Sequence, residues 1–192
     1  MVAHEEMEEV AVIGAGQMGL GVAQVLATTG VRVIIFDVSE DVVDKAIGTI
    51  ASGLDRLVSR DKMSEDDAAA AKSLIEGVAS PDGDYSRLAN CGLVIEAVPE
   101  VLELKERVLS AIAASARPDA IIASNTSSIS MTKLATFVPA ERRAAFAGLH
   151  FFNPVPVAVG ETVILLHPPL PLVGVSIAME RERQQNDSLA NG

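Results

Sequence analysis

The chain has 192 residues, of which 49% are hydrophobic, and a formal net charge of −11. This length and apolar content suit one folded domain with a substantial core and exclude an intrinsically disordered chain. The acidic balance, with no basic cluster to offset phosphate repulsion, excludes nucleic acid as a partner.

Cysteine usage and the two ends of the chain give further expectations. Cys91 is the single cysteine, so neither an intramolecular disulfide nor a cysteine-built metal site is expected, and a cytoplasmic or other reducing compartment is favoured. The acidic N-terminus has no apolar run and does not resemble a targeting peptide. Prolines interrupt the apolar stretches near the C-terminus, which are too short to span a membrane. We therefore expect no metal and no membrane partner.

Strands and helices are predicted to alternate along the chain. Six apolar, β-branched runs predict strands at 10–13, 31–36, 77–80, 93–98, 120–124 and 146–152. Helical spacing of apolar residues predicts helices that begin near Met18, Ser39, Ser64 and Val101. Residues 163–166 are a candidate for one more strand. This alternation predicts an α/β fold with a Rossmann-type, doubly wound and mostly parallel sheet.

A glycine motif joins the first strand to the first helix. In the segment GAGQMG, Gly14 permits a tight turn, Gly16 lets the backbone approach a pyrophosphate, and Gly19 lets helix and strand pack closely. The helix N-terminus, at Gln17 and Met18, would supply amide donors to the phosphates. A glycine turn that binds nothing is the alternative interpretation. The strand before the motif and the helix after it favour dinucleotide binding.

Asp37 closes the second strand, at the distance from the glycines where a carboxylate accepts hydrogen bonds from the adenosine ribose. No arginine directly follows Asp37, so a ribose 2′-phosphate would meet a negative charge without a counter-ion. The sequence therefore predicts NAD rather than NADP as the cofactor.

Three later segments carry a family resemblance: VIEAVPE at 94–100, SNTSS at 124–128 and GLHFFNPVPV at 148–157. Together with the glycine loop, they resemble the NAD-dependent 3-hydroxyacyl-CoA dehydrogenases over about residues 8–157. NAD(P)-dependent 3-hydroxyacid and 6-phosphogluconate-type dehydrogenases share the glycine loop, but HFFNPVPV is not expected in them.

The resemblance implies a role for residues at matching positions. His150 resembles the base that takes the proton from the substrate 3-hydroxyl, which suits an imidazole. Ser127 resembles the hydroxyl that hydrogen-bonds the reacting oxygen, and Asn125 lies beside it along the cofactor cleft. Glu100 and Lys105 stand where the family contacts the cofactor.

Each of these residues also has a structural interpretation. His150 lies at a strand end, where a histidine is often structural, and Ser127 is of a type that commonly caps a helix. Glu100 is compatible with a solvated acid near a helix start. Lys105 is compatible with a surface lysine paired with nearby acids.

The resemblance also implies how an acyl-CoA thioester would be held. In the family, a serine and a basic residue on the long helix after the second strand bind coenzyme A. Gly53 stands at the serine position here, which is a departure, and Arg60 and Lys62 are the candidates for the positive charge.

The chain departs from the family after Val157. The family has a glutamate that orients the catalytic histidine, and at the expected position the chain has Thr162, with Glu161 one residue earlier. A one-residue shift on a strand reverses the side chain's face, and a bulge at Gly160 would restore it. Glu161 is thus the candidate orienting carboxylate.

The expected domains are a flexible N-terminus at 1–7, an NAD-binding Rossmann domain at 8–166 and a divergent, disordered tail at 167–192. The family's helical C-terminal domain is not recognisable, which suggests a truncated or alternatively spliced product. The family's homodimer is therefore doubtful here. The predicted function is oxidation of (S)-3-hydroxyacyl-CoA with NAD. The alternative is a catalytically impaired NAD-binding module.

Overall fold

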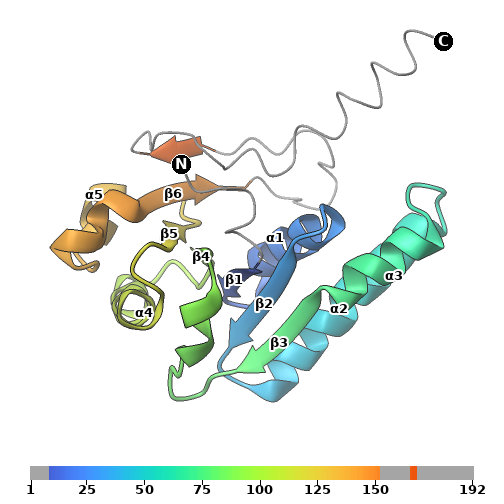
Figure 1. The fold of residues 1–192 in the computed structure, drawn as a ribbon, viewed down its shortest axis with the longest axis horizontal. Helices are drawn as coiled ribbons and strands as arrows, with labels where there is room; N and C mark the ends of the chain where they lie inside the picture. The colour runs from blue at the N-terminus through green and yellow to red at the C-terminus, as the bar shows by residue number, and fades with distance from the viewer. Residues whose placement is uncertain (1–8, 152–164, 168–192) are drawn as a thin grey trace, which may run out of the picture.

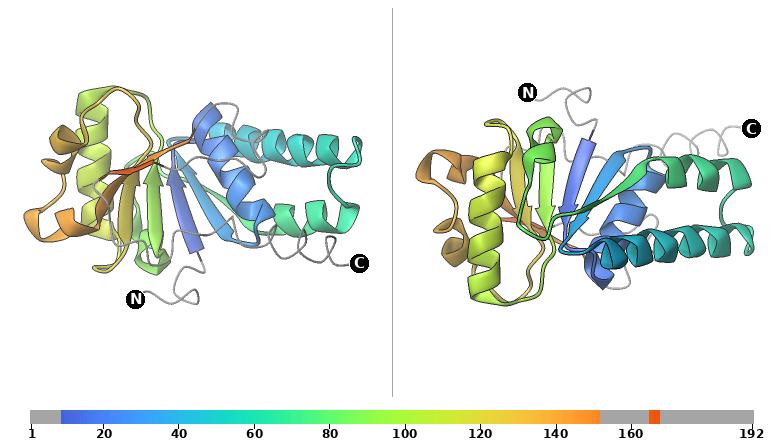
Figure 2. Two further views of the ribbon diagram at one scale, coloured as in Figure 1. Left: turned by 90° about the horizontal axis from the view of Figure 1, so that it is seen from above. Right: turned by 90° about the horizontal axis from the view of Figure 1, so that it is seen from below.

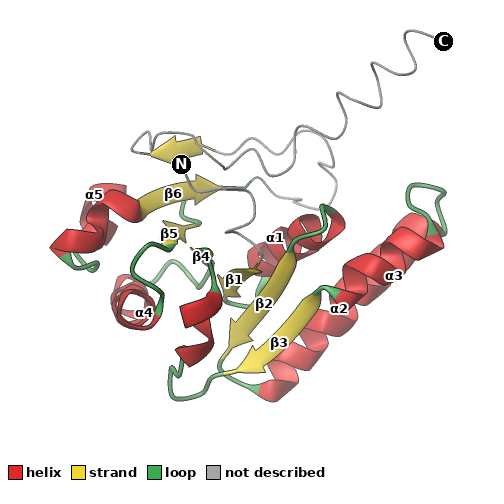
Figure 3. Cartoon of the chain, in the orientation of Figure 1, coloured by secondary structure: helices red, strands yellow, loops and turns green. Residues whose placement is uncertain are grey.

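The computed structural model of the chain describes residues 9–151 and 165–167 (Figure 1). The strands are β1 (Glu9–Ile13), β2 (Arg32–Asp37), β3 (Ile75–Ala79), β4 (Leu93–Glu96), β5 (Ile121–Ser124), β6 (Phe146–His150) and β7 (Leu165–His167). The helices are α1 (Gln17–Thr28), α2 (Glu40–Val58), α3 (Glu65–Ser73), α4 (Leu102–Ser115) and α5 (Met131–Ala135), with 3-10 turns η2 (Ser86–Asn90) and η3 (Ala140–Ala145). Figure 3 shows their alternation along the chain.

The strands form a single sheet in the order β3-β2-β1-β4-β5-β6-β7. The pairs from β3 to β6 are all parallel, and β7 is antiparallel to β6. This is the strand order of the doubly wound dinucleotide-binding fold, with β7 added at one edge. The predicted fold class is confirmed. The third strand begins at Ile75, two residues before its predicted start, and the extra strand is Leu165–His167 rather than 163–166.

The helix caps that the sequence predicts are present. The Ser39 hydroxyl accepts a hydrogen bond from the Val42 amide at the start of α2, and the Ser64 hydroxyl accepts one from the Asp67 amide at the start of α3. Gly30 follows α1 with a φ of 87°, the left-handed conformation that glycine adopts without strain after a helix. Local sequence therefore fixes where these helices begin and end.

Alternate residues of the central strands enter two separate cores. On one face, strand residues including Val10, Val12 and Val33 pack against α1, α2 and α3. On the other face, Ala11 and Ile34 belong to the core that contains α4 and α5. Strands buried on both faces read as continuous apolar runs, as they do in this sequence. Figure 2 shows the strands lying between α4 at one end of the view and α1 to α3 at the other.

Arg142 of η3 fixes the C-terminal end of α4. Its guanidinium donates four hydrogen bonds of 2.7 to 3.3 Å to backbone carbonyls. The acceptors are the carbonyls of Ala113, Ala116, Arg117 and Ala120. The last carbonyls of a helix have no partner within the helix, and a cation there complements the helix dipole. This contact ties the segment before β6 to α4.

Candidate functional site

The glycine loop lies where β1 meets α1, and two of its glycines are required by close contacts. Gly14 has a φ of 110°, and a Cβ atom there would lie 2.7 Å from the Ala97 carbonyl oxygen in the loop after β4. A Cβ on Gly19 would collide with the Gly14 carbonyl oxygen. The predicted tight turn and close helix–strand packing are therefore both seen.

The N-terminus of α1 is open for an anion. Gly16 is its N-cap, with no side-chain cap and with no other atom of the described chain within 4 Å of an added Cβ. The first turn of α1 contains no acidic residue. The helix N-terminus therefore presents amide donors and a favourable dipole, which fits a pyrophosphate. Gln17 and Met18 lie in this first turn, as predicted.

Asp37 lies at the end of β2 beside the glycine loop. Its Oδ2 accepts a hydrogen bond of 2.7 Å from the Ala15 amide, and its Oδ1 accepts one of 2.7 Å from the Val38 amide. The carboxylate is therefore oriented at the edge of the crevice, where a dinucleotide would place its adenosine ribose. Tyr85 lies close to this position, and its burial, followed by the negative charge of Asp37, raises the pKa of its phenol.

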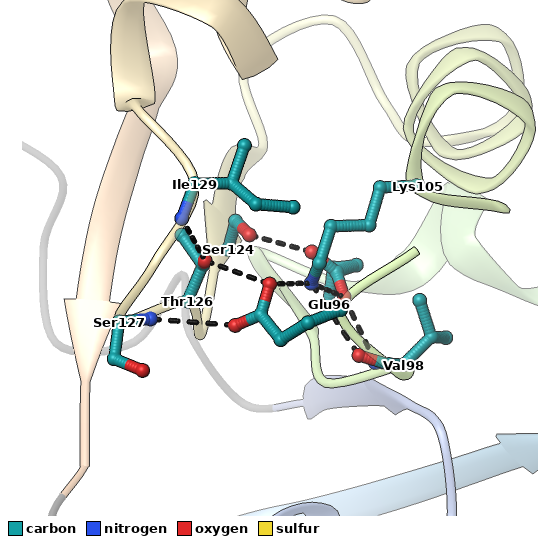
Figure 4. A network of polar contacts seen from close by, with 8 residues as sticks. Glu96, Val98, Lys105, Ser124, Thr126, Ser127 and Ile129 are labelled. Atoms are coloured by element: carbon teal, nitrogen blue, oxygen red, sulfur yellow. Dashed lines mark hydrogen bonds and ion pairs between the residues drawn. The ribbon is translucent and has the colours of Figure 1, made fainter. Parts of the chain in front are cut away.

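A buried ion pair lies where β4 ends (Figure 4). Glu96, the last residue of β4, and Lys105, on the first turns of α4, are both 0% exposed. The Lys105 ammonium lies 2.7 Å from Glu96 Oε1 and also donates to the Val98 carbonyl at 3.4 Å. The other carboxylate oxygen, Oε2, accepts a bond of 2.5 Å from the buried Ser124 hydroxyl at the end of β5. Each polar group of this cluster therefore has a partner.

The network continues to the surface through Glu100. Its Oε2 lies 3.7 Å from the Lys105 ammonium and accepts a hydrogen bond of 2.9 Å from the Thr126 hydroxyl. Its Oε1 accepts a bond of 3.3 Å from the Ser127 amide. The alternative that Lys105 is a surface lysine paired with nearby acids is therefore wrong, because its side chain is fully buried. Glu100 is tied to the loop after β5, and the contacts of both residues with the cofactor stay predictions.

Ser127 and Asn125 lie on the loop that follows β5. Ser127 is exposed and does not cap α5, whose N-cap is Ser130. The Asn125 amide oxygen accepts a hydrogen bond of 3.1 Å from the Phe151 amide, directly after His150. The backbone therefore brings the ends of β5 and β6, and with them Ser127 and His150, to the same edge of the sheet. Glu161 lies outside the described residues, so its predicted role stays a prediction.

The candidate coenzyme A residues lie away from this edge. Arg60 and Lys62 are exposed in the turn between α2 and α3, at the tip of the helical hairpin seen in Figure 1. Gly53 packs on α1, and a Cβ there would lie 2.9 Å from the Gln24 side-chain oxygen. A larger residue at Gly53 would therefore require the Gln24 side chain to shift.

The described residues contain no group of three or more metal-ligating side chains, and none of their helices is long and apolar enough to cross a membrane. Cys91 is fully buried, and this burial raises the pKa of its thiol to about 12. A buried thiol of this kind is chemically inert.

Three functional candidates escaped the sequence analysis: Glu96, Ser124 and Thr126. A usable signal existed for Glu96, because a carboxylate inside the apolar run LVIEAV must have a partner if the run is a buried strand. Lys105, nine residues later on the next helix, is that partner. Nothing comparable marked Ser124 or Thr126, whose side chains are short and common at strand ends.

The glycine loop, the N-terminus of α1 and Asp37 lie beside the point where the strand order of the sheet reverses, between β1 and β4. In a sheet of this order, that point is where dinucleotides bind. Fold and site together define a Rossmann-type dinucleotide-binding domain.

The chain belongs to the family described as "3-hydroxyacyl-CoA dehydrogenase, NAD binding domain", which matches residues 9–160. The family resemblance inferred from the sequence is therefore confirmed, and membership supports NAD as the cofactor.

Relatives and solved structures agree with this assignment. A 3-hydroxybutyryl-CoA dehydrogenase of Bradyrhizobium diazoefficiens is 43% identical over 151 residues, which are 79% of this chain and 50% of the relative. The 3-hydroxyadipyl-CoA dehydrogenase of Escherichia coli is 40% identical over 79% of this chain and 30% of its own length. The crystal structure of (S)-3-hydroxybutyryl-CoA dehydrogenase from Ralstonia eutropha superposes with a TM-score of 0.76 at 38% identity, covering 95% of this chain and 59% of that one. The chain thus spans half of the Bradyrhizobium relative and less than a third of the Escherichia coli relative.

Proposed function

We propose that the chain binds NAD and contributes to the oxidation of (S)-3-hydroxyacyl-CoA to 3-oxoacyl-CoA. The observation that carries the proposal is that the residues expected to bind the cofactor and those expected to act on the substrate lie at the same edge of the sheet. Gly14, Gly16, Gly19 and Asp37 form a dinucleotide cradle, and the ends of β5 and β6 bring Ser127 and His150 to the same edge of the sheet. The family is described as 3-hydroxyacyl-CoA dehydrogenase, and similar proteins are named 3-hydroxybutyryl-CoA dehydrogenase, which supports the substrate class.

Each residue has a defined part in this proposal. NAD supplies the acceptor for the hydride that leaves C3 of the substrate. His150 takes the proton of the 3-hydroxyl, because a neutral imidazole is a base near physiological pH. Ser127 donates a hydrogen bond to the same oxygen, and Asn125 holds the backbone that follows His150. Glu161 orients the His150 ring, as a carboxylate does in other His–carboxylate pairs.

Charge supports an acyl-CoA as the substrate. Arg60 and Lys62 lie exposed on a chain whose net charge is −11, and no ion pair within the described residues engages either of them. They are available for the phosphates of coenzyme A. Gly53 lacks the hydroxyl that the family uses, so these two cations carry more of the binding.

We also propose that the protein works in a reducing compartment, because its single cysteine is buried and forms no disulfide within the chain.

Two measurements test the proposal. NADH binding is followed by the change in its fluorescence, and turnover by NADH-dependent reduction of acetoacetyl-CoA at high protein concentration. We expect binding, and turnover that His150→Gln abolishes without weakening NADH binding. Binding without turnover would instead favour an NAD-binding module that has no catalytic activity alone. A chain that does not bind NADH would refute the proposal.

A further inference from the structure

We propose that Glu96 is a positioning residue that, through Lys105 and Glu100, holds the Ser127 loop beside the nicotinamide half of the dinucleotide. This inference rests on the proposed function, because it assigns a task to residues of the same site. Glu96, its partner Ser124 and the Glu100 partner Thr126 all lie outside the glycine cradle.

The first link is the buried pair. Glu96 and Lys105 are both fully buried, and the carboxylate is further fixed by the Ser124 hydroxyl and the Val98 amide. Its three bonds come from three segments: α4, the end of β5 and the loop after β4. A carboxylate held on both oxygens cannot rotate, so the Lys105 ammonium that it binds has a fixed position where β4 ends.

The second link runs from Lys105 to the Ser127 loop. The Glu100 side chain is 38% exposed, and an exposed carboxylate by itself is hydrated and free to change rotamer. The Lys105 ammonium, 3.7 Å away, supplies a fixed positive charge that selects one orientation. In that orientation Glu100 accepts bonds from the Thr126 hydroxyl and the Ser127 amide at once. The Thr126 oxygen in turn accepts from the Ile129 amide, so the loop is held on both sides of Ser127.

The location of this network makes the inference specific. The cradle for the pyrophosphate and adenosine lies at β1, α1 and β2, whereas Glu96, Glu100 and Ser127 lie at the ends of β4 and β5. A dinucleotide that lies across the crevice places its nicotinamide on the β4–β5 side. Loss of the network should therefore weaken binding of the nicotinamide half and leave the ADP half unaffected.

The test uses a charge-neutral double variant, Glu96→Gln with Lys105→Met, which removes both buried charges together so that no unpaired charge destabilises the fold. Affinity is measured for NADH, which has the nicotinamide, and for ADP-ribose, which lacks it. Exchange of the Ser127 amide proton is followed by NMR without ligand. We expect NADH affinity to fall on the order of tenfold, as for supporting residues in other sites, with unchanged ADP-ribose affinity and faster Ser127 exchange.

Two further variants complete the test. Thr126→Val keeps the shape of the side chain and removes the hydroxyl that donates to Glu100 and accepts from the Ile129 amide, so it loosens the loop without removing a buried charge and should report the same effect, reduced in size. Glu76→Gln with Arg87→Met neutralises an exposed ion pair on β3 and η2 and should change neither ligand's affinity.

The inference is overturned if the double variant weakens NADH and ADP-ribose equally, or weakens neither. If the unaltered chain does not bind NADH, the proposed function fails and Ser127 exchange alone decides. Faster exchange in the double variant and in Thr126→Val, but not in the β3 control, then supports the positioning network, and unchanged exchange refutes it.

Discussion

Removing the Lys105 ammonium should cost the fold far more than removing an exposed charge. In Lys105→Met, the Glu96 carboxyl group loses its cation at a site where both partners are 0% exposed, so solvent does not screen the loss. Breaking a buried pair by deleting one partner typically costs about 3–5 kcal/mol. Total stabilities are about 5–15 kcal/mol, and each kcal/mol shifts the Tm of a domain of this size by roughly 2–4 °C. We therefore expect Tm to fall by about 6–20 °C in thermal unfolding followed by circular dichroism. Urea unfolding measures the accompanying loss of free energy.

A double-mutant cycle decides whether the pair or the packing is responsible. Glu96→Gln combined with Lys105→Met should recover at least half of the lost free energy, because no charge is left without its partner. The matched control is Arg87→Met, which breaks the exposed pair with Glu76 and should cost about 0.2–1 kcal/mol. The reasoning fails if Lys105→Met costs no more than this control, or if the two losses at Glu96 and Lys105 simply add.

Three further changes have expected outcomes. Asp37→Ser should weaken NADH binding by about 10–100-fold, the value of a hydrogen bond to a charged group, and reduce the preference over NADPH; an unchanged NADH/NADPH ratio in fluorescence titrations would contradict the assignment of Asp37. Arg142→Met should lower the free energy of unfolding by about 2–3 kcal/mol in urea, since four backbone carbonyls in and just after the last turn of α4 each lose a hydrogen bond, whereas Arg143→Met, which removes a single bond to the Val138 carbonyl, should cost less. Cys91 should not react with Ellman's reagent at neutral pH until urea unfolds the chain. Because folding raises the pKa of its thiol from 9.0 to about 12, its contribution to stability is present below pH 9 and is lost as the pH rises toward 12; a Cys91→Ala variant with the same alkaline loss would refute that contribution.

Much of the fold could be predicted because its signals are local. Val10 to Ile13 and the strand before Asp37 are apolar runs bounded by glycine or a charged residue, and both are strands in the structure. Ser39 and Ser64 cap the helices they were expected to cap. The glycine spacing predicted the position of the cradle, since Gly14 and Gly19 stand where a side chain would collide with a backbone carbonyl.

The rest depended on contacts between distant segments. The hydrogen bonds that Glu96 shares with Ser124 and Lys105 join three elements, and no spacing rule relates Ser124 to Glu96. The same holds for Arg142, whose acceptors lie more than twenty residues earlier in the chain. Lys105 was recognised only through the family's pattern, which gave its position and not its burial. Only the Glu96–Ser124 contact follows from the register of parallel strands, because these two residues lie side by side on β4 and β5.

The pairing of β1 with β4, in which Val10 lies beside Leu93, also constrains how the protein comes to function. Each half of the sheet is assembled from strands and helices that follow one another closely, but joining the halves closes a long loop, which costs chain entropy before any contact repays it. The crevice exists only along that junction. A partly folded chain with both halves formed separately therefore has no complete dinucleotide site, and a ligand that binds the joined state adds its binding free energy to the stability of that one junction.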